Sequence, residues 1–152
     1  MGYSIDSAEW PTGIEVSQAV KNLVERFYLL LDDSSPSSGD TLADEVFASD
    51  GVAHFSPVPS RGSEEIRLSR RNAWDNITSR KHRVLKVYIC GPDADDLLFT
   101  GHAEMEFKNG QRVASEYAGR IRVTRSQGEN PKISHYQVWA DMSAFVKALS
   151  QG

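Results

Sequence analysis

Two side chains that can move protons, His102 and Glu104, lie two residues apart in the segment LLFTGHAEMEF. Because this segment alternates as β-strands do, both side chains are predicted to point to the same face. Imidazole and carboxyl groups are common general acids and bases in enzymes. The spacing therefore predicts a proton-transfer pair, provided that this face lines a cavity.

The turn after this segment sets what lies opposite the pair. The Asn-Gly dipeptide at 109–110 best fits a two-residue type I′ hairpin turn. Such a turn pairs His102 with Tyr117 and Glu104 with Ser115 on one face. The Tyr117 hydroxyl could then donate a hydrogen bond to an oxygen that gains negative charge. The alternatives are that Glu104 is solvated at the open edge of the sheet and that the tyrosine only packs.

Three further side chains could contribute to the same site. Arg70 falls on the inner stripe of a predicted helix, where its charge needs a partner such as Glu104 or an anionic ligand group, unless it reaches solvent past Trp74. Tyr136, on the last predicted strand, offers a second hydroxyl. His82 begins another strand and could assist as a base, or lie at the surface.

Composition narrows the class of protein. The net charge is −4 and the pI is near 5.5, which argues against a surface for nucleic acid or anionic membranes. Cys90 is the single cysteine, so no intramolecular disulfide can form, and the histidines lack the spacing of common metal motifs. The N-terminus lacks the features of a signal peptide. We therefore expect a cytoplasmic protein that uses no cofactor or metal and contacts neither nucleic acid nor membrane.

Hydrophobic periodicity and turn signals divide the chain into helices and strands. Helices are predicted over 15–33, 40–49, 63–77 and from 143 onward, and strands over 52–55, 80–90, 97–123 (the hairpin) and 132–140. This order predicts an α+β fold, with helices packed on one face of a curved antiparallel sheet. The chain is expected to form a single domain over 1–152, with an ordered core of about 15–149.

The predicted register also leaves an apolar patch on the outer face of the sheet. It consists of Phe99, Met105, Phe107 and Trp139 around small residues. Such a patch is larger than monomers usually expose, so it predicts a homodimer.

The order of four short motifs, DGVAHFSP, RGSEEI, RKHRVLKVY and ISHYQVWAD, resembles the SnoaL-like branch of the nuclear-transport-factor-2-like superfamily. The resemblance implies a cone-shaped, barrel-like fold whose concave face holds a small organic molecule. The combination of SRKH, DLLFTGHAEMEFKNG and ISHYQVWADMS is similar to small SnoaL-like proteins of filamentous fungi, many of them encoded beside natural-product pathways.

The resemblance also carries over to single positions. Phe55, Phe27 and Gly119 stand where the related ketosteroid isomerase has its base and oxyanion groups, so steroid isomerase chemistry is excluded. His82 and His102 are placed like the two histidines of scytalone dehydratase. Asp141 lies one residue after the position of the catalytic aspartate in SnoaL-type cyclases, and a bulge would be needed to turn it inward.

Together these observations predict a cofactor-independent acid/base enzyme, an isomerase, cyclase or dehydratase acting on a small, largely apolar natural-product intermediate. The expected catalytic residues are His102, Glu104, His82 and Asp141. The expected substrate-binding residues are Tyr117, Tyr136, Arg70, Ser115, Phe27, Phe55 and Trp74. The alternative is a non-catalytic small-molecule-binding or dimerising module with the same fold.

Overall fold

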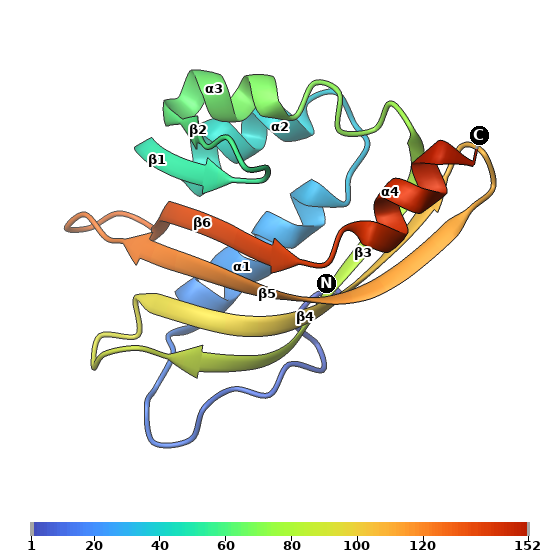
Figure 1. The fold of residues 1–152 in the computed structure, drawn as a ribbon. Helices are drawn as coiled ribbons and strands as arrows, with labels where there is room; N and C mark the ends of the chain where they lie inside the picture. Colours follow the sequence, from blue (N-terminus) through green and yellow to red (C-terminus); the bar gives the residue numbers. More distant parts are fainter. Residues whose placement is uncertain (1, 152) are drawn as a thin grey trace.

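A computed structural model describes residues 2–151 and shows a mixed sheet of six strands with four α-helices (Figure 1). The helices are α1 (Gln18–Leu31), α2 (Ser38–Thr41), α3 (Gly62–Ser69) and α4 (Ser143–Ser150), and a π-helical turn, η1 (Leu42–Val46), follows α2. The strands are β1 (Phe47–His54), β2 (Ser60–Arg61), β3 (Ile77–Ile89), β4 (Asp96–Phe107), β5 (Arg112–Thr124) and β6 (Lys132–Ala140).

The strands follow the order β2-β1-β6-β5-β4-β3. All neighbours are antiparallel except β1 and β6, which run parallel. The sheet is strongly curved and is not closed into a barrel, and α1 lies on its concave side (Figure 1). α3 packs on β1, whereas α4 contacts β5. The predicted α+β cone is therefore confirmed.

Most predicted elements are present, and the last strand has the predicted bounds. The main difference is the third helix, which ends at Ser69 rather than near residue 77. The chain then passes through turns before β3, so Arg70 lies just beyond the helix. The first strand begins earlier than predicted, at Phe47, because the fully buried Phe47 belongs to the core beside β6.

The β4–β5 turn differs from the prediction by one residue. The backbone N–H of Phe107 donates to the carbonyl of Gln111, so three residues, not two, form the loop. Of these three, only Gly110 has a positive φ, at 84°. A type I′ turn would also place Asn109 at positive φ, which costs energy for a residue other than glycine. Asn109 instead uses its side chain to bond the N–H of Gln111 and the carbonyl of Ala148.

This single residue reverses which face of β4 points inward. His102 now lies opposite Glu116 and Glu104 opposite Ala114, so both face outward. Inward positions are instead occupied by apolar residues: Leu97, Phe99, Ala103, Met105 and Phe107. Burying a large apolar side chain contributes about 1.5–3 kcal/mol, whereas burying a charged one is costly, so packing decides the register.

The predicted register and its consequences are therefore wrong for β4. Phe99 and Phe107 are buried in the core, so the apolar patch proposed for a homodimer does not exist as predicted. Trp139 alone of that patch remains exposed on the outer face, at 46%.

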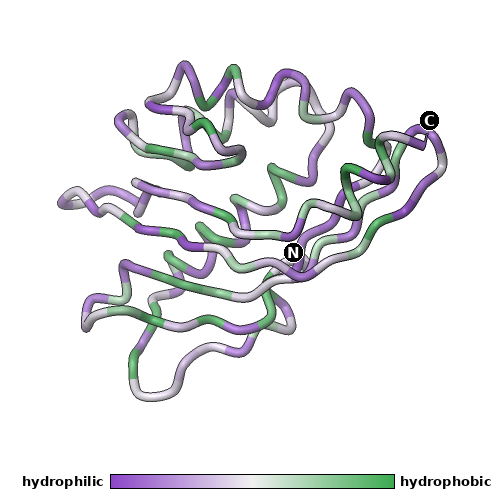
Figure 2. Tube along the Cα trace, in the orientation of Figure 1, coloured by the Kyte–Doolittle hydropathy of each residue, from purple (hydrophilic) through white to green (hydrophobic). Residues whose placement is uncertain are grey.

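The core lies between α1 and the concave face of the sheet. Its largest fully buried side chains are Tyr28, Phe27, Phe47, Phe99 and Leu42. Hydrophobic and hydrophilic residues alternate along the strands, and the β5–β6 turn is hydrophilic (Figure 2). Over residues 2–151, none of the helices has both the length and the apolar character to cross a membrane.

Candidate active site

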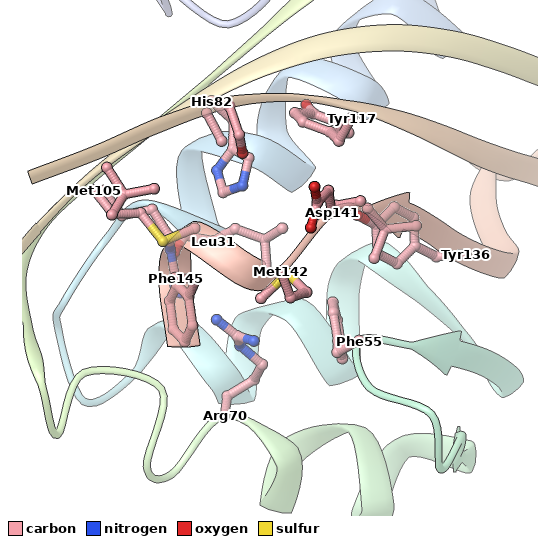
Figure 3. A pocket seen from close by; sticks show the side chains of 16 residues that line it. Leu31, Phe55, Arg70, His82, Met105, Tyr117, Tyr136, Asp141, Met142 and Phe145 are labelled. Atoms are coloured by element: carbon pink, nitrogen blue, oxygen red, sulfur yellow. The ribbon is translucent and has the colours of Figure 1, made fainter. Parts of the chain in front are cut away.

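One cavity of about 170 Å³ opens between the concave face of the sheet and the helices. This volume is close to that of a protein cavity that holds benzene. Its sheet wall consists of Arg80, His82, Ala103, Met105, Val113, Ser115, Tyr117, Tyr136, Val138 and Ala140. The opposite side and the mouth consist of Leu31, Phe55, Arg70, Asp141, Met142 and Phe145 (Figure 3).

His82 projects from β3 into the cavity (Figure 3). A buried carboxylate, that of Asp32, holds its ring. Nδ1 of His82 lies 2.6 Å from Oδ1 of Asp32. An ionised carboxylate can only accept hydrogen bonds, so Nδ1 carries the ring proton. The other ring nitrogen, Nε2, is then left with a free lone pair, and no residue from 2 to 151 forms a hydrogen bond with it.

Asp32 is almost fully buried, with 2% of its side chain exposed. Its second oxygen, Oδ2, accepts hydrogen bonds from the backbone N–H of His82 and from the hydroxyl of Tyr3, both at 2.7 Å. With the bond to Nδ1, the carboxylate thus receives three donors. Buried charge is tolerated only when it is bonded in this way, and three bonds also fix the orientation of the carboxylate.

Arg80 completes this buried group. Its guanidinium donates to the carbonyl of Leu31 at the end of α1 and lies 3.8 Å from Asp32. The ring of Trp74 stacks on it, with 4.6 Å between the guanidinium carbon and the ring centroid. Burial lowers the pKa of Arg80, while the charge of Asp32 opposes this shift. Arg80 therefore balances the charge of Asp32 inside the fold.

Arg70 enters the cavity from the opposite side, just beyond α3 (Figure 3). Its guanidinium lies 4.9 Å from the centroid of the Phe55 ring. Burial, together with the charge of Arg80, lowers its pKa to about 10. Arg70 is therefore positively charged at neutral pH.

Three buried tyrosines, Tyr28, Tyr117 and Tyr136, lie close together, and the rings of Tyr28 and Tyr117 pack beside that of His82. The hydroxyl of Tyr117 lies over Gly101 of β4 and, like that of Tyr28, is shielded from solvent without a hydrogen-bond partner in the described chain. Burial raises the pKa of Tyr117 and raises that of Tyr136 to about 12, so both stay protonated at neutral pH. Tyr117 thus offers its ring to the cavity rather than its hydroxyl.

Asp141 reaches the cavity although it follows an inward-facing residue. β6 ends at Ala140, so the chain no longer alternates at Asp141 and turns into α4. The carboxylate accepts a hydrogen bond from the backbone N–H of Ser143, which lowers its pKa. Asp141 lies at the exposed mouth and helps to begin α4.

Of the predicted site residues, the structure brings seven to the cavity: His82, Asp141, Tyr117, Tyr136, Arg70, Ser115 and Phe55. Nε2 of His102 lies 3.4 Å from Oε1 of Glu104, so the two side chains are close together. They lie on the outer face of the sheet, however, with 32% and 52% of their side chains exposed. Among the described residues that line the cavity, neither Phe27 nor Trp74 occurs. Phe27 packs on Tyr136, and Trp74 covers Arg80.

Asp32 was not among the site residues predicted from the sequence. The sequence signal that could have identified it is its position: Asp32 directly follows the last residue of α1 and is itself followed by a second aspartate. Negative charge at the C-terminal end of a helix interacts unfavourably with the helix dipole, so an aspartate at this position indicates another role.

Within residues 2–151, no group of three or more acidic, histidine or cysteine side chains is placed so that it could hold a metal ion.

Comparison with known proteins supports the fold. Neither a protein-family model nor a curated protein matches the sequence. Among solved structures, a protein from Bacillus cereus assigned as a polyketide cyclase has a TM-score of 0.70 at 13% identity, over 99% of this chain and 93% of its own. A nuclear-transport-factor-2-like protein of unknown function from Burkholderia pseudomallei has a TM-score of 0.66 at 13% identity, over 88% and 99%.

A type 2 hexachlorocyclohexane dehydrochlorinase is also similar, with a TM-score of 0.65 at 16% identity, over 81% of this chain and 83% of its own. At these identities the likeness concerns the fold alone. The chain therefore has the nuclear-transport-factor-2-like fold, which other proteins use for enzyme chemistry.

Proposed function

We propose that this protein is a cofactor-independent enzyme in which His82, held by Asp32, removes a proton from a carbon atom of a small, largely apolar substrate. The reaction that this arrangement fits best is an elimination such as a dehydration; isomerisation and cyclisation begin with the same step. A natural-product intermediate is the substrate class that the SnoaL-like resemblance suggests.

The His82–Asp32 pair is the observation that carries this proposal. A neutral imidazole whose Nδ1–H is held by a buried carboxylate presents a free Nε2 as a base. When Nε2 takes up the proton, the ring becomes positively charged, and the nearby Asp32 stabilises that charge. Since this pair lies at the wall of an apolar cavity, water competes little with the substrate for the base.

In a dehydration, the C–H electrons would form the new double bond as the neighbouring C–O bond breaks. The proton on Nε2 would then pass to the departing hydroxide, which leaves as water and restores the neutral His82. Tyr136 lines the cavity, so its hydroxyl could stabilise negative charge that develops on the substrate. The similar dehydrochlorinase and polyketide cyclase lend support to this class of chemistry.

A general carbon acid can test the proposal before the substrate is known. In 5-nitrobenzisoxazole, removal of one C–H proton breaks the N–O bond and releases a coloured phenolate. His82→Gln should lower turnover of this probe by about a hundredfold or more, which is the usual contribution of a general base. Asp32→Asn should lower it as well, because the amide can donate to Nδ1 and so moves the ring proton to Nε2.

His102→Gln is the matched control, because it removes the outer-face histidine from the same sheet. It should leave turnover unchanged. Nitrogen NMR of the His82 ring gives an independent result, with the proton on Nδ1 in the wild type and on Nε2 in Asp32→Asn. If the wild type turns over the probe no faster than His82→Gln, the proposal is wrong and a non-catalytic binding module is favoured.

A further inference from the structure

The charged groups that line the cavity differ in how they are paired. Arg80 is compensated by Asp32, as described above, and Asp141 bonds the N–H of Ser143 at the mouth. Arg70 has only the Phe55 ring beside it, and no acidic side chain of residues 2–151 lies within ion-pair distance of its guanidinium. Among the described residues, Arg70 is therefore the charged group of the cavity that has no close partner of opposite charge or hydrogen-bond partner.

An aromatic ring covers one face of a guanidinium but leaves its N–H donors, which lie in the guanidinium plane, without acceptors. Leaving such donors unpaired in a partly buried position is costly. In Figure 3 the guanidinium of Arg70 points into the cavity, on the side opposite His82. The missing acceptors would thus lie inside the cavity, where a ligand binds.

We infer that Arg70 binds a carboxylate group of the ligand, so that the cavity selects small apolar acids. Calling this ligand the substrate rests on the proposed function. One guanidinium matches a carboxylate through two parallel N–H···O bonds. A ligand carboxylate also supplies the single negative charge that Arg70 lacks beside it.

The rest of the cavity fits the remainder of such an acid. Its wall between Arg70 and His82 is apolar and includes Leu31, Met105, Val113 and Phe145. The volume of about 170 Å³ corresponds to roughly one six-membered ring. The carboxylate at Arg70 would hold this body in one orientation, with a carbon atom presented to the base on the opposite wall.

Benzoate and benzamide test the inference, because they have nearly the same shape and differ in charge. The wild type should bind benzoate about tenfold or more tightly than benzamide in calorimetric titrations, as expected for a charge-assisted pair. Arg70→Met, which keeps the apolar stem, should abolish this preference. Arg70→Lys keeps the charge without the paired N–H donors and should retain only part of it.

Arg71→Met is the matched control, because it removes an exposed arginine from the neighbouring position. It should leave both affinities unchanged. Equal affinities of the wild type for benzoate and benzamide would overturn the inference. A loss of preference in Arg71→Met as large as that in Arg70→Met would also overturn it. Asp141→Asn tests whether Asp141 already pairs with Arg70, and a preference for benzoate that appears only in this variant would overturn the inference too.

His82→Gln separates this inference from the proposed function. It should abolish turnover of the benzisoxazole probe while keeping the preference for benzoate. If the wild type prefers benzoate but turnover does not depend on His82, the carboxylate site is supported and the proposed reaction is wrong. If turnover depends on His82 but the wild type does not prefer benzoate, the carboxylate site is wrong and His82 is still supported as the base.

Discussion

Gly101 tests both the hairpin register and the position of Tyr117. In the structure Gly101 is paired with Tyr117, whose ring lies across the glycine. A Cβ atom added at Gly101 would lie 2.2 Å from Cζ and 2.4 Å from the hydroxyl oxygen of Tyr117. Under the two-residue turn, Gly101 would instead face outward, where a methyl group meets no such ring.

The cost of Gly101→Ala follows from this geometry. The ring must retreat by about 0.8 Å to reach even the 3.0 Å below which real Cβ contacts essentially do not occur. It is packed among His82, Tyr28 and Phe99, with ring centroids 5.7, 6.2 and 6.5 Å away, so it has little room. Overpacking of this kind costs about 1–3 kcal/mol. For a chain of this length, that predicts a Tm lower by about 2–12 °C.

Urea unfolding of four proteins measures the effect: the wild type, Gly101→Ala, Tyr117→Ala and the double variant. Without the Tyr117 ring, the added methyl group meets no clash and should cost less than about 0.5 kcal/mol, because alanine is otherwise preferred to glycine within a strand. The coupling free energy should therefore exceed about 0.5 kcal/mol. A Gly101→Ala protein as stable as the wild type, or an equal cost in both backgrounds, would refute the observed register.

Two further predictions concern ion and hydrogen-bond partners. Tyr3→Phe removes the 2.7 Å hydrogen bond to Asp32 and should lower the free energy of unfolding by about 1.5–3 kcal/mol. The control Tyr88→Phe, at an exposed position, should change it little. Equal effects of the two substitutions would show that the Tyr3–Asp32 bond does not stabilise the fold. Arg120 bonds both oxygens of Asp96 and lowers its pKa, so Asp96→Asn should cost about 0.5–1 kcal/mol at neutral pH, allowing for partial exposure. A carboxyl with a lowered pKa stabilises the fold above its unfolded pKa and loses this effect as pH falls through the folded value, so the difference between Asp96→Asn and wild type should vanish in acid unfolding curves. A difference that persists at low pH would show another cause.

The sequence predicted the features that depend on local patterns. The α+β fold and the bounds of β6 follow from periodicity and turn signals, and on β5 the inward positions of Ser115 and Tyr117 are as predicted. The prediction for β4 was wrong because one extra residue in the turn reverses the face of every β4 side chain relative to β5. A comparison of the two faces of β4 would have corrected the error, since the face with Phe99 and Phe107 is the one that gains by burial.

Asp32 shows why the proposed catalytic pair was harder to predict. It and His82 are 50 residues apart, and only the packing of α1 on the sheet brings them together. No pattern within either segment encodes that distance. What the sequence does contain is a local conflict, namely a carboxylate at the negative end of a helix. Such conflicts between local preference and the fold are expected to concentrate at functional sites.

The structure resolves this conflict with the same groups that build the proposed base. Arg80 donates to the carbonyl of Leu31 at the helix end, and its positive charge lies beside Asp32. Arg80 thus offsets both the helix dipole and the charge of the Asp32 carboxylate. Asp32 in turn holds the Nδ1–H of His82. Arg70 receives no such internal partner, and this difference between the two arginines is why we assign Arg80 to the support of the base and Arg70 to the ligand.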